Sequence, residues 1–257
     1  AVYNLSGSNG VTGTITGNDI TFNDEYNAWT FGGTDTRTSK LQSSALPSTF
    51  SGDQVHSVAM WFKCDVVSGD TLFSITQPSS PYEDSEKVIS VRFNDASGGL
   101  RYLFWSNDIH YHGTDANIVK DIWYHLCATY SGGGGTTDNK KLYLNGNELN
   151  HTGTNGSSLG NNLALPSGSV IRLGSRVQDT TRFFGSIANF RLFSKALSTD
   201  QVKELYDYEA ARFGIREDLV SVHKGNLGIG LRDPEQRLVV AGSLQEFPPG
   251  PMTEEYT

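Results

Sequence analysis

The sequence predicts an all-β protein: an antiparallel sandwich of two sheets in jelly-roll form, with one short helix and a β-rich C-terminal tail. The chain of 257 residues contains 28 Gly but only 2 Met, so it is rich in turn formers and poor in helix formers. Short segments with alternating apolar side chains recur between clusters of Gly, Asn, Asp and Ser, as in sandwiches and jelly rolls. One stretch alone has apolar residues at helical spacing.

Seven segments have the β-branched and aromatic residues, and the period of two, that are typical of strands. They are 56–65, 87–93, 100–106, 122–130, 141–149, 169–175 and 186–193. In the fifth of them, Asn145 and Gly146 predict a hairpin turn, because both residues tolerate positive φ. The glycine-rich stretch 131–140 joins two strands, so we expect an exposed loop and not a phosphate site at a helix start.

Alternation along 122–130 predicts which side chains share a face of the strand. One face carries Trp123, His125 and Cys127, and the other carries Tyr124, Leu126 and Ala128. Because both faces are largely apolar, we expect a buried strand, with His125 as a hydrogen-bonded core histidine and not a catalytic base. Cys64 and Cys127 are the only cysteines, and two buried thiols or one disulfide are both compatible with the sequence.

The helix is predicted from Ser198, which is followed three residues later by Gln201 in the pattern of a capping box. Gly214 is the expected C-terminal cap. The apolar positions between them are Val202, Leu205, Tyr206, Ala210 and Phe213. This apolar stripe predicts a helix that covers apolar surface of the sandwich.

Charge and hydropathy exclude two classes of partner. The formal net charge is -8, which disfavours nucleic acid because neutralising phosphates needs a basic face. No apolar run approaches the roughly 18 residues of a membrane span, and the N-terminal residues lack the pattern of a signal peptide. We therefore expect no nucleic acid and no membrane insertion.

Four motifs in order resemble the laminin-G and pentraxin-like branch of the concanavalin A-like fold. They are VAMWFK, IWYHLCATYSG, KLYLNGNEL and FFGSIANFRLFSKALSTDQVKELY, and the resemblance covers about residues 15–214. It implies a two-sheet antiparallel jelly roll that binds carbohydrate or protein, often with calcium at a loop rim. It also implies that the pentraxin disulfide is not kept: Cys127 matches one partner, but the other falls near Ala59, and alternation points Cys64 to the opposite face.

The resemblance directs attention to loop residues that could contact a glycan or an ion. Rim aromatics and histidines that could contact a sugar are Tyr82, Trp105, His110, Tyr111 and His112. For calcium, the loop after the Ile-x-Leu-Gly strand offers Gln178 and Asp179, although Arg176 and Arg182 flank them. Calcium is the one cofactor that the sequence suggests, and an ordinary polar hairpin loop is the alternative.

Catalysis is not expected. Glycosidases of this fold carry Glu-x-Asp-x-Glu on one strand, and that pattern is absent. The acidic cluster at 83–86 lies in a stretch rich in Pro and Ser, which favours solvated charges over a catalytic pair. No Gly-x-Ser-x-Gly elbow and no Cys/His/Asp constellation occurs either.

The composition changes after Gly214, so we expect two parts, a sandwich at 1–214 and a tail at 215–257. In the tail, Gly228 and Gly230 are not followed by the third glycine and the helix of a nucleotide loop. The glycines are interpreted as turns between two short strands, 219–222 and 237–240. GNLGIGLRDPEQRLVVAGS resembles a module that is frequent in phage tail fibres, tailspikes and large-virus surface proteins, where it packs around a three-fold axis.

That resemblance implies a homotrimer, whose apolar contacts would come from Val220, Val222, Ile229, Leu238 and Val240. We therefore expect a non-catalytic binding module of an extracellular or virion surface that recognises glycans or a cell-surface protein. The alternative is a structural assembly protein that makes protein contacts only, and a polysaccharide-active enzyme is the least favoured interpretation.

Overall fold

The computed structural model describes most of the chain. The described residues are 2–3, 12–17, 19–32, 40–67, 71–79, 84–94, 98–111, 116–155, 159–176, 183–214, 220–223, 226–229 and 238–240. They form two compact units, Ala1–Ala210 and Ala211–Thr257, which are taken separately below. Among these residues, no helix is long and apolar enough to cross a membrane.

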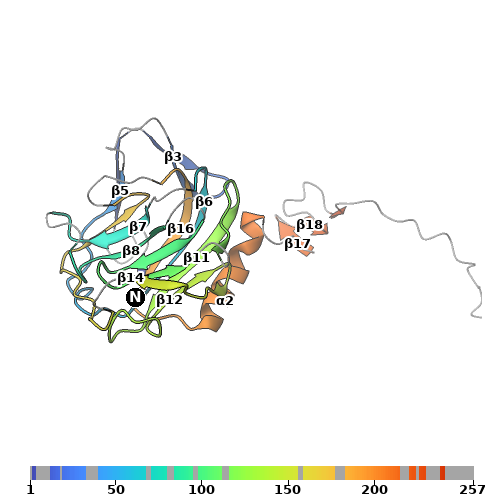
Figure 1. The fold of residues 1–257 in the computed structure, drawn as a ribbon. Coiled ribbons are helices and arrows are strands. Elements are labelled where there is room, and N and C mark those ends of the chain that lie inside the picture. Colours follow the sequence, from blue (N-terminus) through green and yellow to red (C-terminus); the bar gives the residue numbers. More distant parts are fainter. Residues whose placement is uncertain are drawn as a thin grey trace, which may run out of the picture. The chain divides into compact units, whose positions relative to one another are not determined.

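The first unit contains two antiparallel sheets that pack as a sandwich (Figure 1). The first sheet runs in the order β13 (Asn147–Glu148), β12 (Lys140–Leu144), β11 (Trp123–Tyr130), β6 (His56–Cys64), β16 (Gly185–Phe193), β4 (Ala28–Phe31) and β3 (Ile20–Asn23), with β1 (Val2–Tyr3) paired to β16. The predicted hairpin turn is confirmed, because Asn145 and Gly146 join β12 to β13 with φ of 50° and 79°.

The second sheet runs in the order β14 (Gly153–Asn155), β10 (Asp108–Tyr111), β9 (Leu100–Leu103), β8 (Ile89–Phe93), β7 (Thr71–Thr76), β15 (Val170–Leu173), β5 (Lys40–Ser43) and β2 (Gly13–Thr16). Strands β7 to β10 are consecutive in the chain and adjacent in the sheet, whereas β15 joins β7 from far along the sequence.

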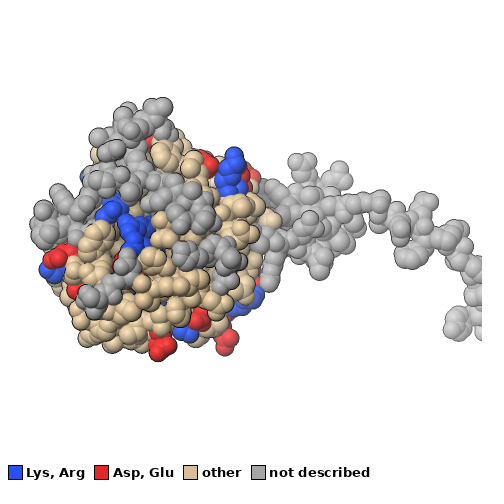
Figure 2. Space-filling model, viewed as in Figure 1, with Lys and Arg blue, Asp and Glu red and all other residues tan. Residues whose placement is uncertain are grey.

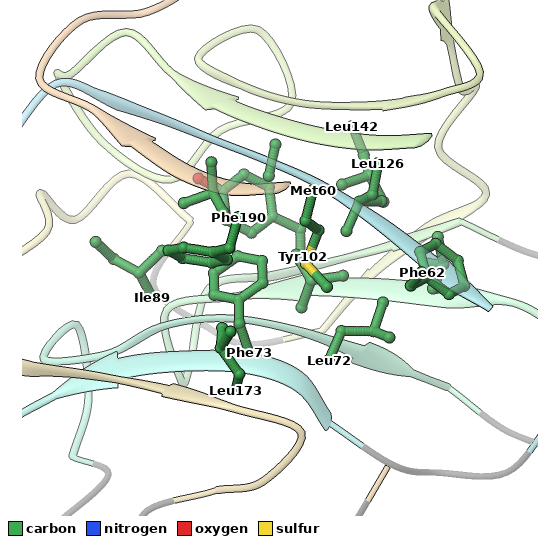
Figure 3. Close-up of a cluster of buried hydrophobic side chains, with 14 of the residues drawn as sticks. Met60, Phe62, Leu72, Phe73, Ile89, Tyr102, Leu126, Leu142, Leu173 and Phe190 are labelled. Carbon is green, nitrogen blue, oxygen red and sulfur yellow. The ribbon is translucent and has the colours of Figure 1, made fainter. Parts of the chain in front are cut away.

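The core fills the space between the two sheets (Figure 3). The first sheet contributes Met60, Phe62, Leu126, Leu142 and Phe190, and the second contributes Leu72, Phe73, Ile89, Tyr102 and Leu173. Burying each large apolar side chain stabilises the fold by about 1.5–3 kcal/mol. The predicted two-sheet sandwich is therefore confirmed.

Strand β11 shows that the predicted alternation is right. Tyr124, Leu126 and Ala128 belong to the core between the sheets. Cys127 lies on the opposite face and pairs in register with Ala59. Cys64 faces the core instead, and both thiols are free and buried, so the two cysteines lie on opposite faces of the sheet and form no disulfide.

Helix α2 (Thr199–Ala210) covers the outer face of the first sheet, as predicted. Its capping box is complete: the backbone N–H of Gln201 donates to Ser198 Oγ, and the backbone N–H of Ser198 donates to Gln201 Oε1, both at 3.2 Å. Val202 and Leu205 pack in a cluster with Cys127.

His125 lies under this helix with 1% exposure, in a cluster with the rings of Trp61 and Tyr206, which also stack on each other. The expected hydrogen bond is wrong: among the described residues, neither ring nitrogen has a hydrogen-bond partner, because aromatic rings surround the imidazole.

The second unit begins with the short 3₁₀ helix Ala211–Phe213, and Gly214 follows with the positive φ of a C-terminal cap, 73°. Three strands come next: β17 (Val220–His223), β18 (Asn226–Ile229) and β19 (Leu238–Val240). The interpretation of Gly228 as a turn is wrong, because it lies inside β18, which pairs antiparallel with β17 and parallel with β19. The two expected strands correspond to β17 and β19, and both pair with β18, which lies between them in the sheet.

Candidate ligand-binding face

The outer face of the second sheet is polar and strongly basic. Along β8, β9, β10 and β15, every second residue points to the core, so the residues between them point outward. The outward charged and ionisable positions are Arg92 on β8, Arg101 on β9, Asp108 and His110 on β10, and Arg172 on β15. Figure 2 shows basic side chains gathered over the part of the sandwich where β7 and β8 lie in Figure 1.

Trp105 stands on the hairpin turn between β9 and β10, at the edge of this face. Its φ is 60° and that of Ser106 is 82°. Two successive positive φ values are typical of turns that use Asn-Gly, because larger side chains are strained there. A backbone strain of roughly 1–3 kcal/mol per residue is more often kept at functional sites than elsewhere. The Trp105 turn is therefore a candidate functional position.

A buried lysine, Lys140, supports this turn through hydrogen bonds to backbone oxygens. The Lys140 Nζ donates to the backbone oxygen of Asn107 at 2.8 Å and to that of Tyr102 at 3.1 Å. The same ammonium lies 4.0 Å from the ring centroid of Phe104. Burial lowers the pKa of Lys140 to about 7, and the Asp108 carboxylate partly opposes that effect. Nothing in the local sequence indicates this support, because Lys140 resembles an ordinary lysine at the end of a loop.

The segment that contains Ser85 and Glu86 also supports the Trp105 turn through hydrogen bonds. The backbone N–H of Glu86 donates to the carbonyl of Phe104 at 2.8 Å, and the hydroxyls of Ser85 and Ser106 are 2.8 Å apart. Glu86 also has a positive φ, 60°. The conformation of the Trp105 turn is thus fixed by contacts from two other segments, which makes its side chain a preorganised feature of the surface.

Two guanidinium groups accompany the half-buried Trp105 ring. The Cζ atoms of Arg176 and Arg92 lie 5.1 and 6.0 Å from the ring centroid, within the range of cation–π contacts. Arg172 stands next to Arg176: its Nε donates to Gln42 Oε1 at 2.7 Å and one terminal nitrogen donates to the Arg176 carbonyl at 3.3 Å. Farther along the face, Arg101 and Asp108 form an ion pair of 2.7 Å.

The structure places some of the predicted ligand residues on this face. Trp105 belongs to its edge, and His110 lies on it, directly opposite Arg101 in register. Tyr111 instead points into the core with 3% exposure, and its hydroxyl donates to the Lys140 carbonyl at 3.5 Å. Tyr82, His112, Gln178 and Asp179 lie outside the described residues.

Sequence reasoning missed the arginines as functional candidates. Arg92, Arg101 and Arg172 each occupy an outward position of an alternating strand, and that pattern is visible in the sequence. Their gathering is not visible, because it depends on β15 joining the sheet beside β7.

A concave feature lies at the edge of the first sheet. It is a hollow of about 470 Å³ lined by Ala116, Tyr124, Leu144, Asn145, Asn147, Glu148, Leu149 and Asn150. Three amide side chains and a tyrosine edge give it groups that can bind sugar hydroxyls. It is therefore the alternative location for a saccharide.

The described residues contain no group of three or more His, Cys, Asp and Glu side chains placed to hold a metal ion. Their buried carboxylates are Asp108 and Glu209, each in an ion pair with an arginine, Arg101 and Arg191 respectively. Asp108 is on the second sheet and Glu209 is on the helix that covers the first, so the two do not face a common site.

Comparison with known proteins gives one family. A laminin G family model, described as the Concanavalin A-like lectin/glucanases superfamily, matches residues 16–203. No curated protein sequence matches the chain.

Solved structures share the fold at low identity. Domain 4 of AbnA, an extracellular arabinanase from Geobacillus stearothermophilus in complex with arabinotriose, is 21% identical with a TM-score of 0.56, over 80% of this chain and 97% of that one. The binding domain of botulinum neurotoxin serotype G is 15% identical with a TM-score of 0.57, over 80% of this chain but only 48% of that one. A heptameric pentraxin from Limulus polyphemus is 19% identical with a TM-score of 0.51, over 70% and 81%.

Proposed function

Because the chain belongs to the Concanavalin A-like lectin/glucanases superfamily, we propose that its sandwich is a non-catalytic module that recognises carbohydrate. The structures that share its fold include an arabinanase domain solved with arabinotriose and receptor-binding domains of neurotoxins. Fold likeness alone does not assign a function, so the proposal depends on the site.

The observation that carries the proposal is the Trp105 turn. A tryptophan is held half-buried at the edge of an outward face, on two residues with positive φ, by hydrogen bonds from Lys140 and Glu86. Trp105 is not one of the residues of the core between the sheets, whereas its neighbour Phe104 is. An aromatic ring on a rigid turn is a group that can contact a sugar ring without losing conformational freedom.

The absence of catalysis is part of the proposal. Hydrolysis of a glycosidic bond uses two carboxyl groups about 5–10 Å apart on either side of the bond. The buried carboxylates of the described residues lie on different layers of the sandwich, and each is neutralised by an arginine. Neither pairing leaves a carboxyl group in the arrangement that an acid and a base need.

The proposal is tested on a glycan array with the full chain and Trp105→Ala. We expect the full chain to bind a subset of glycans and the variant to lose that binding. Tyr208→Ala is the matched control, because Tyr208 is 84% exposed on helix α2 and should leave binding unchanged. Thermal unfolding of both variants shows whether the fold is kept.

Three results would count against this site. If Trp105→Ala binds as the full chain does while Asn147→Ala loses binding, the hollow on the first sheet is the site instead. If the folded full chain binds no glycan, carbohydrate recognition itself is wrong. Release of shortened products from a polysaccharide would contradict the non-catalytic assignment.

A second function, assembly, is favoured by the tail. By strand register, Val220 lies opposite Ile229 and Ile229 opposite Val240, while Val222 lies opposite Leu227 and Leu227 opposite Leu238. All of these apolar positions therefore fall on one face of the three-stranded sheet. We propose that this face joins three copies of the chain in a fibre-like assembly on a virion or another extracellular surface. A tail that assembles and a sandwich that binds are compatible in one protein.

A further inference from the structure

The surroundings of Trp105 indicate what kind of saccharide it would meet; this inference rests on the proposed carbohydrate-binding function. Here the guanidinium groups of Arg176 and Arg92 lie 5.1 and 6.0 Å from the ring centroid. The ring therefore presents positive charge together with apolar surface, which suits a ligand with an acidic group.

The arginines are positioned in advance. Arg172, which is 4% exposed, is fixed by Gln42 and supports the Arg176 backbone through a hydrogen bond to its carbonyl. The Cζ atom of Arg92 lies 6.0 Å from the ring centroid, within the range of a cation–π contact. A guanidinium has five N–H donors, so one that already has contacts can still donate to an anion.

Positive charges lie close together on this face, which is electrostatically unfavourable. Arg92 lies directly opposite Arg101 in register, and such a pair on one face of a sheet is destabilising by itself. Asp108 offsets the charge of Arg101.

Two hydroxyl groups beside the arginines have unused hydrogen-bonding capacity. Ser74 lies directly opposite Arg172 in register, and Ser175 precedes Arg176 in the chain. Both side chains are buried, at 0% and 3% exposure, and their Oγ atoms have no hydrogen-bond partner among the described residues. Because both Oγ atoms are inaccessible to solvent, they are not themselves contacts for a ligand, and the arginines carry the argument.

The overall charge does not oppose this assignment. The chain carries a net charge of -8, which repels anions at long range. At physiological ionic strength that repulsion is screened beyond about 8 Å, so guanidinium groups in contact with the ligand decide the sign of the interaction.

We propose that the face around Trp105 binds an acidic saccharide, with Arg92 and Arg176 donating to its carboxylate or sulfate and with the Trp105 ring against its apolar surface. Arg172 is a positioning residue that holds Arg176. Arginine and a planar carboxylate can form two parallel hydrogen bonds, which would also orient the sugar ring.

The test compares neutral and acidic glycans on one array, followed by calorimetry of each acidic glycan that binds and of its methyl ester or its desulfated form. The proteins are the full chain, Arg92→Gln, Arg176→Gln and Arg176→Lys, with Lys120→Gln as the control. Lys120 is an exposed lysine whose side chain is 70% exposed, so its loss changes the net charge equally without touching the face.

We expect binding to acidic glycans, a roughly tenfold or greater loss of affinity in each Gln variant, and an intermediate loss in Arg176→Lys, which keeps charge but not the planar fork. Lys120→Gln should stay within about twofold. Esters or desulfated forms should bind as weakly as the Gln variants do, and comparison of the two arms identifies carboxylate or sulfate as the anion.

Binding confined to neutral glycans, or equal binding of an acid and its ester, would overturn this inference and leave carbohydrate recognition standing. Loss of affinity in Lys120→Gln equal to that in the Arg variants would show that net charge, and not this face, attracts the ligand. Absence of any glycan binding by the folded protein would overturn both proposals.

Discussion

Two histidines in the interior of this sandwich, His56 and His125, stay neutral at pH values at which a free histidine is protonated. Burial lowers the pKa of His125 to about 3, with the nearby Arg191 charge acting in the same direction. Burial also lowers the pKa of His56 to about 4, although a hydrogen bond with the Gln54 carbonyl opposes the shift. Both rings therefore fold in the uncharged form.

These shifts predict acid sensitivity. The unfolded chain binds a proton on each histidine near pH 6.5, while the folded chain binds it only near pH 3 to 4. The unfolded state thus holds more protons in this window, and stability is full above about pH 6.5 and is lost as the pH falls through the folded values. Chemical denaturation at a series of pH values measures the loss.

The variant His125→Phe should reduce this loss, because it removes one of the two groups and keeps an aromatic ring beside Trp61. The control is His151→Phe at an exposed position. An acid profile of His125→Phe that is as steep as that of the parent would show that His125 is not one of the groups responsible.

Trp105 and His110 are two candidate ligand residues whose surface position the sequence predicts correctly. Both were singled out from sequence as aromatic or histidine positions near a turn, and both belong to the outward face or its edge. Tyr111, the next residue in the same strand, is in the core. Alternation separates His110 from Tyr111 once the strand is known, but the sequence analysis places both in a loop, where alternation does not apply.

At the scale of elements, prediction worked where a strand is long and apolar on alternate positions. Strands β6, β11 and β16, with eight or nine residues each, are of this kind. The short strands β2 to β5 and β10 were not foreseen, because four residues carry little periodicity. Strand β7 is not predicted either: a bulge between Thr71 and Phe73 interrupts its alternation, so that Leu72 and Phe73 both belong to the core.

The capping box of helix α2 makes a prediction at this scale. In Ser198→Ala the backbone N–H of Gln201 loses its 3.2 Å acceptor, so the free energy of unfolding should fall by about 1 kcal/mol. Glu204→Ala, at an exposed position of the same helix, is the control and should change stability by less than about half that amount. Equal effects of the two substitutions on thermal unfolding would mean that the cap is not important.

At the scale of the whole molecule, the sequence could predict the sandwich but not the binding face. The fold follows from local periodicity and from family motifs that match residues 16–203. The face requires β15 to lie beside β7, so that Arg172 and Arg176 approach Arg92 and Trp105. Such a contact between distant segments depends on topology, which no single stretch of sequence encodes.

The tail predicts the state of association. Light scattering of the full chain should give a trimer, and a chain that ends at Gly214 should be a monomer. In the full chain, Leu238→Asp should also give a monomer, because it puts a charge on the apolar face of the tail sheet. Val239→Asp is the matched control, since its position falls on the opposite face by register. A monomeric full chain would show that the trimer is wrong.

The central claim, that the sandwich binds a saccharide at Trp105, is tested most directly by nuclear magnetic resonance of the tryptophan side chains. The chain has 4 Trp, so the indole N–H groups give a small set of resolvable signals. Titration with a glycan that the full chain binds should move the Trp105 signal and leave that of Trp61, which is buried and donates to Glu209 at 2.7 Å. A titration that saturates while the Trp105 signal stays in place would contradict the account.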